Sequence, residues 1–306
     1  MSRYTLYRLG QSALTIVGVS ILVFMFLHLA PGDPAALIAG PQASEADLQV
    51  IRATYGFDDP LPVQYWRWLA RILRGDFGYS HRAGQPVGAD IARAFPISLT
   101  LACGGLLVAV AVGIPLGMTA AIHREGAMDL TVMGLAVAGM SMPVFWLALL
   151  MILLFALRLG WLPSSGWDSL RHYILPIFSV SLASLALISR MTRSIMIEVL
   201  LEDYVRTARA KGVRERAVFY RHALRNALLP IVTVVGLRFS LLVSGAVVTE
   251  TVFAVPGLGR LIVLAVSSRD FPVVQGGVLV ISVAISMANL IVDLLYATLD
   301  PRIRYE

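Results

Sequence analysis

The sequence predicts an all-α integral membrane protein that crosses the bilayer six times. Of its 306 residues, 58% are hydrophobic and 14% are charged, whereas soluble domains carry roughly 25% charged residues. Six apolar stretches approach or exceed the roughly 20 helical residues that a bilayer core requires. None of them alternates between polar and apolar residues as a β-barrel strand does, so a helical bundle is the expected spanning structure.

The six expected spans lie at about residues 9–30, 95–122, 130–157, 173–192, 227–249 and 271–293. The first resembles a signal peptide because Arg3 and Arg8 precede it, but its uncharged run, 9–32, is 24 residues long. A cleavable signal has an apolar region of roughly 7–15 residues. We therefore expect this segment to be retained as a transmembrane helix.

Basic residues are concentrated in two segments that we expect in the cytoplasm. The N-terminus carries Arg3 and Arg8 without an acid, and residues 190–225 carry nine basic against four acidic side chains. Positively charged loops stay on the cytoplasmic side, so six spans place both termini there, with the tail 299–306, and residues 31–94 outside. We assign the net charge of +6 to loops that face anionic lipid and expect no nucleic-acid partner.

The expected external segment, residues 31–94, has local structure of its own. The Ser-Glu-Ala-Asp sequence at Ser44 is typical of a helix N-terminus. A second amphipathic stretch, residues 62–73, is rich in tyrosine and tryptophan. These aromatic side chains fit two roles, as anchors at the membrane interface or as part of a platform that contacts an external partner.

One cytoplasmic stretch, residues 193–226, has more structure than a topology signal needs. Residues 204–211 predict a short helix, and Gly212 fits its C-cap, where a left-handed backbone is required. A second helix is expected over 214–226, with Pro230 near the start of the fifth span. The alternative is a basic loop that only fixes the topology.

The first of these two helices offers a surface to another protein. Its small side chains, at Thr207, Ala208 and Ala210, permit close approach. The flanking arginines can pair with acidic groups of that protein.

Residues 204–212, with the Arg-His-Ala-Leu-Arg-Asn-Ala-Leu-Leu-Pro sequence at 221–230, resemble the coupling segment of binding-protein-dependent ABC importer permeases. The resemblance is closest to the dipeptide, oligopeptide, nickel and glutathione branch, and residues 37–41 look most like glutathione-type permeases. Other stretches agree in order and spacing, at 29–34, 75–78, 173–176, 250–253, 256–260, 269–273 and 299–305. The resemblance implies the type I ABC importer permease fold.

Three features depart from the wider family. The coupling motif begins with Arg-Thr-Ala at 206–208 instead of Glu-Ala-Ala, and the gap from Gly212 to Pro230 is longer. Both look normal for the peptide branch. The third is Arg238, which stands where an uncharged polar residue is expected.

The resemblance implies a permease subunit that forms half of the translocation pathway of an ATP-driven importer in the bacterial cytoplasmic (inner) membrane. The implied solute is a dipeptide, an oligopeptide or glutathione, with nickel or another small non-peptide solute as the alternative. The implied partners are a second homologous permease, two ATP-binding subunits, an external, periplasmic solute-binding protein and membrane lipid. The residues implied to couple to the ATPase are Tyr204, Arg206, Thr207, Ala208, Arg209, Ala210, Lys211, Gly212 and Val213.

The chain lacks the sequence that would let it hydrolyse ATP, so we do not expect it to be an enzyme. A P-loop requires Gly-Lys followed by Ser or Thr, and the only lysine, Lys211, lies between Ala210 and Gly212. We expect ATP and Mg on the partner ATPase subunits, with no catalytic residue, cofactor or metal site in this chain.

Arg238 is charged and lies near the midpoint of the fifth expected span. Inserting an arginine at the centre of a bilayer costs roughly 2.5–3.5 kcal/mol. Its side chain should therefore face the bundle interior, a partner subunit or a wet cavity. Two roles stay open, a contact for a substrate carboxylate in the translocation pathway and a structural pair with a polar group of the partner permease.

Two other classes of protein fit less well. An intramembrane hydrolase needs paired catalytic groups at membrane depth, and the expected spans offer no close carboxylate pair. A secondary transporter usually has internal repeats and several embedded ionisable groups, which the sequence does not show.

Overall fold

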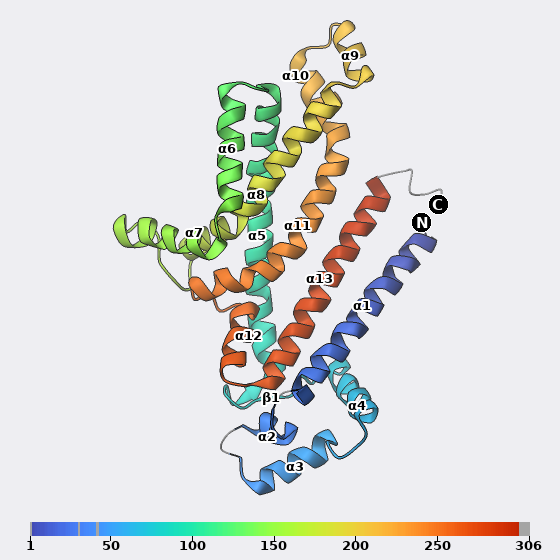
Figure 1. Cartoon of the computed structure of the whole chain (residues 1–306), viewed down its shortest axis with the longest axis vertical. Coiled ribbons are helices and arrows are strands. Elements are labelled where there is room, and N and C mark those ends of the chain that lie inside the picture. Colours follow the sequence, from blue (N-terminus) through green and yellow to red (C-terminus); the bar gives the residue numbers. More distant parts are fainter. Residues whose placement is uncertain (1, 30, 41–42, 300–306) are drawn as a thin grey trace.

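The computed structural model describes residues 2–29, 31–40 and 43–299, and most of this is helical (Figure 1). The exception is an antiparallel pair of short strands, β1 (Tyr79–Ser80) and β2 (Gln85–Pro86). The helices in chain order are α1 (Ser2–Leu29), α2 (Pro34–Ala39), α3 (Glu45–Tyr55), α4 (Leu61–Leu73), α5 (Val87–Ile122), α6 (Ala127–Ser141), α7 (Val144–Met151), the π-helical η1 (Ile152–Arg158), α8 (Leu170–Leu200), α9 (Asp203–Ala210), α10 (Glu215–Ala217), the π-helical η2 (Val218–Ala223), α11 (Leu224–Val252), α12 (Leu258–Ser267) and α13 (Phe271–Leu299).

Within the described residues, five helices are long and apolar enough to cross a membrane. They are Leu6–Leu29, Val87–Ile122, Leu170–Leu200, Glu215–Val252 and Phe271–Leu294. These helices confirm the expectation of a helical membrane protein. Their bounds are wider than the apolar runs, because helical structure continues into the polar flanks: α5 begins eight residues before residue 95, at Val87.

The third expected span, 130–157, is not one helix, and that expectation is wrong. Its two halves, Ala127–Ser141 and Val144–Arg158, meet at a bend of 105°. Pro143 follows Met142 and disfavours a helical backbone there, so Met142 is extended, with φ −84° and ψ 126°. Six crossings are reached only when this bent pair counts as one.

The second helix expected in the cytoplasm, 214–226, and the fifth span are also not separate elements. α10, η2 and α11 run on as one helix, Glu215–Val252, and Pro230 lies inside it rather than near its start. Prolines are tolerated within membrane helices when neighbouring groups satisfy the freed backbone. Consequently, the end of this helix next to α9 is joined without a break to its apolar, membrane-spanning part.

Close approach of α5 and α8 organises the centre of the bundle. A Cβ atom at Gly117 would lie 2.4 Å from the carbonyl oxygen of Ser189. The Ser189 hydroxyl donates a hydrogen bond to the carbonyl of Gly113 at 2.9 Å. Small residues that let two backbones meet in this way are the usual basis of helix packing in membranes.

Helices α2, α3 and α4 lie together at one end of the molecule, where α1 ends and α13 begins (Figure 1). α4 is fastened to α1 by Phe24, whose ring centroid is 5.5 Å from that of Tyr65 and 5.8 Å from that of Trp68. Trp66 points away and is 67% exposed. Of the aromatic side chains in the expected stretch 62–73, Tyr65 and Trp68 therefore pack inside this chain, and Trp66 remains available to lipid or a partner.

Polar contacts stabilise this segment locally. Ser44 and Asp47 form the reciprocal hydrogen bonds of a capping box at the start of α3, which confirms the expected helix N-terminus. The Arg71 guanidinium donates to Asp76 at 2.8 Å and holds the pKa of that carboxyl below its usual range.

A fully buried carboxylate attaches α12 to α11 and α5. Glu250 accepts hydrogen bonds from the Ser98 hydroxyl at 2.5 Å and from the Arg260 backbone amide at 2.9 Å. The same hydroxyl accepts from the Leu258 amide at 2.7 Å. Because the first amides of a helix carry partial positive charge, a carboxylate at that end of α12 is stabilised. A Cβ at Gly257 would lie 2.4 Å from the Glu250 carboxyl carbon, so a glycine is required there.

Replacing Ser98 by Ala should loosen this attachment. The change leaves a buried Glu250 oxygen and the Leu258 amide without their partner, which costs about 1–3 kcal/mol per unsatisfied group. We expect a lower thermal unfolding temperature of the purified protein. Thr251→Ala is the matched control, since the Thr251 hydroxyl bonds only to its own helix, at Val247. Equal shifts in the two variants would contradict this role of Ser98.

Candidate coupling segment and intramembrane charges

The short helix α9 projects beyond the bundle between α8 and α10 (Figure 1). Its inner face carries Val205, which is fully buried, and Ala208, which is 8% exposed. Both pack with Val218 of η2. The expectation that Ala208 lies on a docking surface is therefore wrong, because its methyl group holds α9 against the start of the long α10–α11 helix.

The other predicted residues of α9 face outward. Tyr204, Arg206, Thr207, Arg209 and Ala210 are exposed, as are Lys211 and Gly212 in the following turn. Val213 is partly buried beside the Val205 cluster. A contact surface for another protein is thus left on one side of α9, and the small side chains on it are Thr207 and Ala210.

Gly212 has the left-handed backbone that the sequence predicts, with φ +75°. Its amide donates to the carbonyl of Arg209 at 2.9 Å, and the amide of Val213 donates to that of Ala208 at 3.2 Å. A Cβ atom at Gly212 would meet nothing within 4 Å. Glycine is therefore required by the backbone conformation and not by crowding.

Arg209 bridges the turn. Its guanidinium donates to both carboxylate oxygens of Glu215, at 2.9 and 3.3 Å. Both side chains are exposed, at 40% and 58%, so this ion pair contributes less than about 1 kcal/mol. Arg209 orients α9 relative to α10 and is engaged within this chain.

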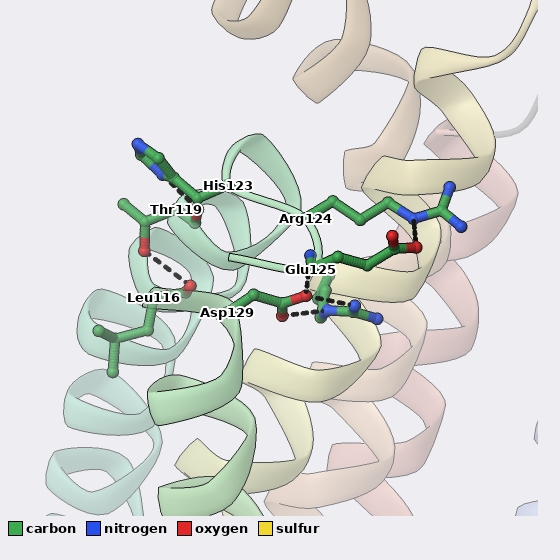
Figure 2. A network of polar contacts seen from close by, with 7 residues as sticks. Leu116, Thr119, His123, Arg124, Glu125 and Asp129 are labelled. Carbon is green, nitrogen blue, oxygen red and sulfur yellow. Dashed lines mark hydrogen bonds and ion pairs between the residues drawn. The ribbon is translucent and has the colours of Figure 1, made fainter. Parts of the chain in front are cut away.

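A buried ion pair that the sequence analysis did not single out lies ten residues before α9. The Arg193 guanidinium of α8 donates to Asp129 at the start of α6, with one contact at 2.6 Å, and the Asp129 side chain is 4% exposed. Asp129 also accepts from the Glu125 amide at 2.9 Å, and Figure 2 shows this network at the turn between α5 and α6. The sequence signal that could have revealed this pair is Asp129, an acid directly before the apolar stretch 130–157.

Arg238 lies in α11 and is partly buried. Within residues 2–29, 31–40 and 43–299 it has no hydrogen bond or ion pair. Another arginine, Arg190 of α8, acts on it electrostatically. Both roles expected for Arg238 require a negative or polar group from outside this chain to pair with its guanidinium. The absence of a partner among the described residues agrees with that requirement.

Breaking the Asp129–Arg193 pair should destabilise the end of the bundle that lies next to α9. Asp129→Asn leaves a mostly buried guanidinium without its counter-charge, which costs about 3–5 kcal/mol. Thermal unfolding of the purified protein measures the loss. Asp168→Asn, at an exposed acid in the loop before α8, is the control. No difference between the two variants would show that the pair contributes nothing to stability.

Comparison with known proteins supplies the family. The chain matches the binding-protein-dependent transport system inner membrane component over residues 113–305 and the N-terminal part of such membrane components over residues 1–102. It is 46% identical to the glutathione transport system permease protein GsiC of Salmonella paratyphi A and 45% identical to that of Escherichia coli strain K12. Each match covers 100% of both chains.

The fold has a relative among solved structures. An inward-facing conformation of the MetNI methionine ABC transporter superposes with a TM-score of 0.60 at 18% identity, covering 69% of this chain and 96% of that one. This likeness confirms the type I ABC importer permease fold. The chain therefore belongs to the inner membrane components of binding-protein-dependent transport systems and is a multi-pass permease subunit of an ABC importer.

Proposed function

We propose that this permease forms half of a pathway that imports a peptide-like solute, glutathione or a short peptide, into the bacterial cytoplasm. The observation that carries the proposal is the 46% identity, over the full length of both chains, to a glutathione transport system permease protein. The unpaired Arg238 in the membrane supports it, because peptides and glutathione carry carboxylates that an arginine recognises.

The orientation of the chain follows from its charges. α1 runs toward α2–α4 and α13 runs away from them (Figure 1), so their far ends share a side with α9. Residues 190–225, which include α9, carry nine basic against four acidic side chains. The positive-inside rule then places both termini and α9 in the cytoplasm, and α2–α4 outside, where they can meet the solute-binding protein.

The family requires an ATPase and a solute-binding protein as partners. We infer a complex with a second homologous permease and two ATP-binding subunits, with ATP and Mg held on the latter. The sequence supports this division of labour, because its only lysine, Lys211, is not part of a P-loop.

The exposed face of α9 is the proposed docking surface for the ATPase. Thr207 and Ala210 permit close approach, and Tyr204 adds an exposed aromatic side chain. The buried face of α9 is fastened through Ala208 to Val218, on the unbroken helix Glu215–Val252. A push on α9 is therefore transmitted as a rigid-body tilt of the wall of the pathway.

Uptake by the assembled importer tests the proposed solute. The permease pair, its ATPase and its binding protein are reconstituted in liposomes with Mg-ATP, and radiolabelled glutathione, a dipeptide and nickel are compared. We expect ATP-dependent uptake of glutathione or the dipeptide, because the pathway recognises their carboxylates. Uptake of nickel alone would overturn the proposed solute class while leaving the importer assignment intact.

Two substitutions test the coupling role of α9. Gly212→Val forces a β-branched residue into a left-handed backbone, at a cost of at least roughly 1–2 kcal/mol, and Ala210→Asp places a charge on the proposed docking surface. We expect both to abolish solute-stimulated ATP hydrolysis or to lose the ATPase on purification, while membrane insertion is normal. Gly160→Val is the matched control, since Gly160 has φ +64° and open space like Gly212 but lies far from α9. Full coupling in both α9 variants would reduce this segment to a topology loop.

A further inference from the structure

Two arginines on helices that qualify as membrane spans have no partner among the described residues, Arg190 toward the α9 end of its helix and Arg238 near the middle of its span. Arg190 belongs to α8 and Arg238 to α11, and both helices qualify as membrane spans. Arg190 is exposed and Arg238 is partly buried. Neither makes a hydrogen bond or ion pair with a described residue, in contrast to Arg193, one turn further along α8, which is paired with Asp129.

Packing contacts bring the two arginines to similar depth. Val180 of α8 shares a buried cluster with Leu242 of α11. Nearer the cytoplasm, Met196 shares another with Ile231. At 1.5 Å per residue, Arg190 lies about 15 Å from Val180 along its helix.

Arg238 lies between the same two clusters on the antiparallel helix, about 6 Å from Leu242 along the axis. The two arginines are thus separated in depth by about one to two helical turns. The electrostatic effect of Arg190 on Arg238 agrees with this proximity.

An unpaired arginine at this depth is unfavourable, and a second one nearby adds repulsion. The exposed Leu237 and Leu241 lie on the same helix as Arg238. The surface that these residues form on the isolated chain can therefore contact another protein or the solute. The arrangement is stabilised by an anion that reaches both guanidinium groups. A carboxylate suits the planar, bidentate geometry of arginine.

We propose that Arg190 and Arg238 together form a carboxylate-binding site in the translocation pathway, with Arg190 as a second specificity-determining residue. This inference rests on the proposed import of a peptide-like solute. The passing solute supplies the carboxylate, and in its absence water in the pathway hydrates the two guanidinium groups. An acidic side chain of the partner permease and a lipid phosphate are the competing sources of negative charge.

The test compares uptake of glutathione with uptake of its carboxyl-amidated form by the complete importer in liposomes. The variants are Arg190→Gln, Arg238→Gln, the double variant and Arg190→Lys. Arg171→Gln is the matched control, because Arg171 is an exposed arginine at the other end of α8. Co-purification of the partner permease and the ATPase is measured for each variant.

We expect each Gln variant to lower the preference for the free carboxylate by about tenfold, as loss of one hydrogen bond to a charged group does. The double variant should lose little more than either single one, because the two groups act on the same carboxylate. Arg190→Lys should restore part of the preference, and Arg171→Gln should leave it unchanged.

Three outcomes would overturn the proposal. A wild-type preference in Arg190→Gln, with an altered one in Arg238→Gln, removes Arg190 from the site and leaves the proposed function standing. Loss of the partner permease from both Gln variants assigns the charges to a subunit contact. A preference that follows the anionic lipid content of the liposomes and not the arginines assigns them to lipid. Failure of the wild-type importer to take up any peptide-like solute would instead refute the proposed function.

Discussion

A bilayer core neither hydrates a charge nor satisfies a free backbone group, and the rest of this structure depends on that constraint. Two acids of the chain, Glu250 and Asp129, meet it by lying buried beside fixed donors. Glu250 is held by Ser98 and the first amides of α12, and Asp129 by Arg193 and a backbone amide. Arg190 and Arg238 have no such donor or counter-charge among the described residues, and under the proposed function the assembled importer and its solute supply the counter-charge.

The same helices that carry these arginines meet at α9. α8 leads into it, and the helix Glu215–Val252 leads away from it into the membrane. At the end of the bundle next to α9, a cluster that includes Met118, Met196 and Ile231 packs α5, α8 and α11 together. In the proposed coupling, movement of α9 reaches the pathway through these packed, continuous elements, and the Glu250 contacts carry it on to α12 at the opposite end of α11.

Apolar run length and arginine distribution were sufficient to predict a helical membrane protein, because hydropathy reports directly on lipid contact. Gly212 was also predictable, since few residues accept φ +75°. The bend at Met142 could not be predicted, because a uniformly apolar stretch does not show where a helix changes direction. A proline inside a span can be tolerated within the helix, as at Pro230, or can break the helix, as at Pro143. The burial of Ala208 and the Asp129–Arg193 pair depend on tertiary packing between distant segments, which single-sequence periodicity cannot supply.

The central claim is that the helix Glu215–Val252 moves as one rigid body when the ATPase closes on α9. Spin labels at Tyr220 and Val248, both exposed, placed in a background with Cys103 replaced by Ser, measure it by pulsed electron resonance in nucleotide-free and ATP-bound importer. The account predicts an unchanged distance between Tyr220 and Val248, together with a changed distance from Val248 to the equivalent position of the second permease. A changed distance between Tyr220 and Val248 would show that the π-helical turn at 218–223 bends as a hinge, and would contradict rigid transmission.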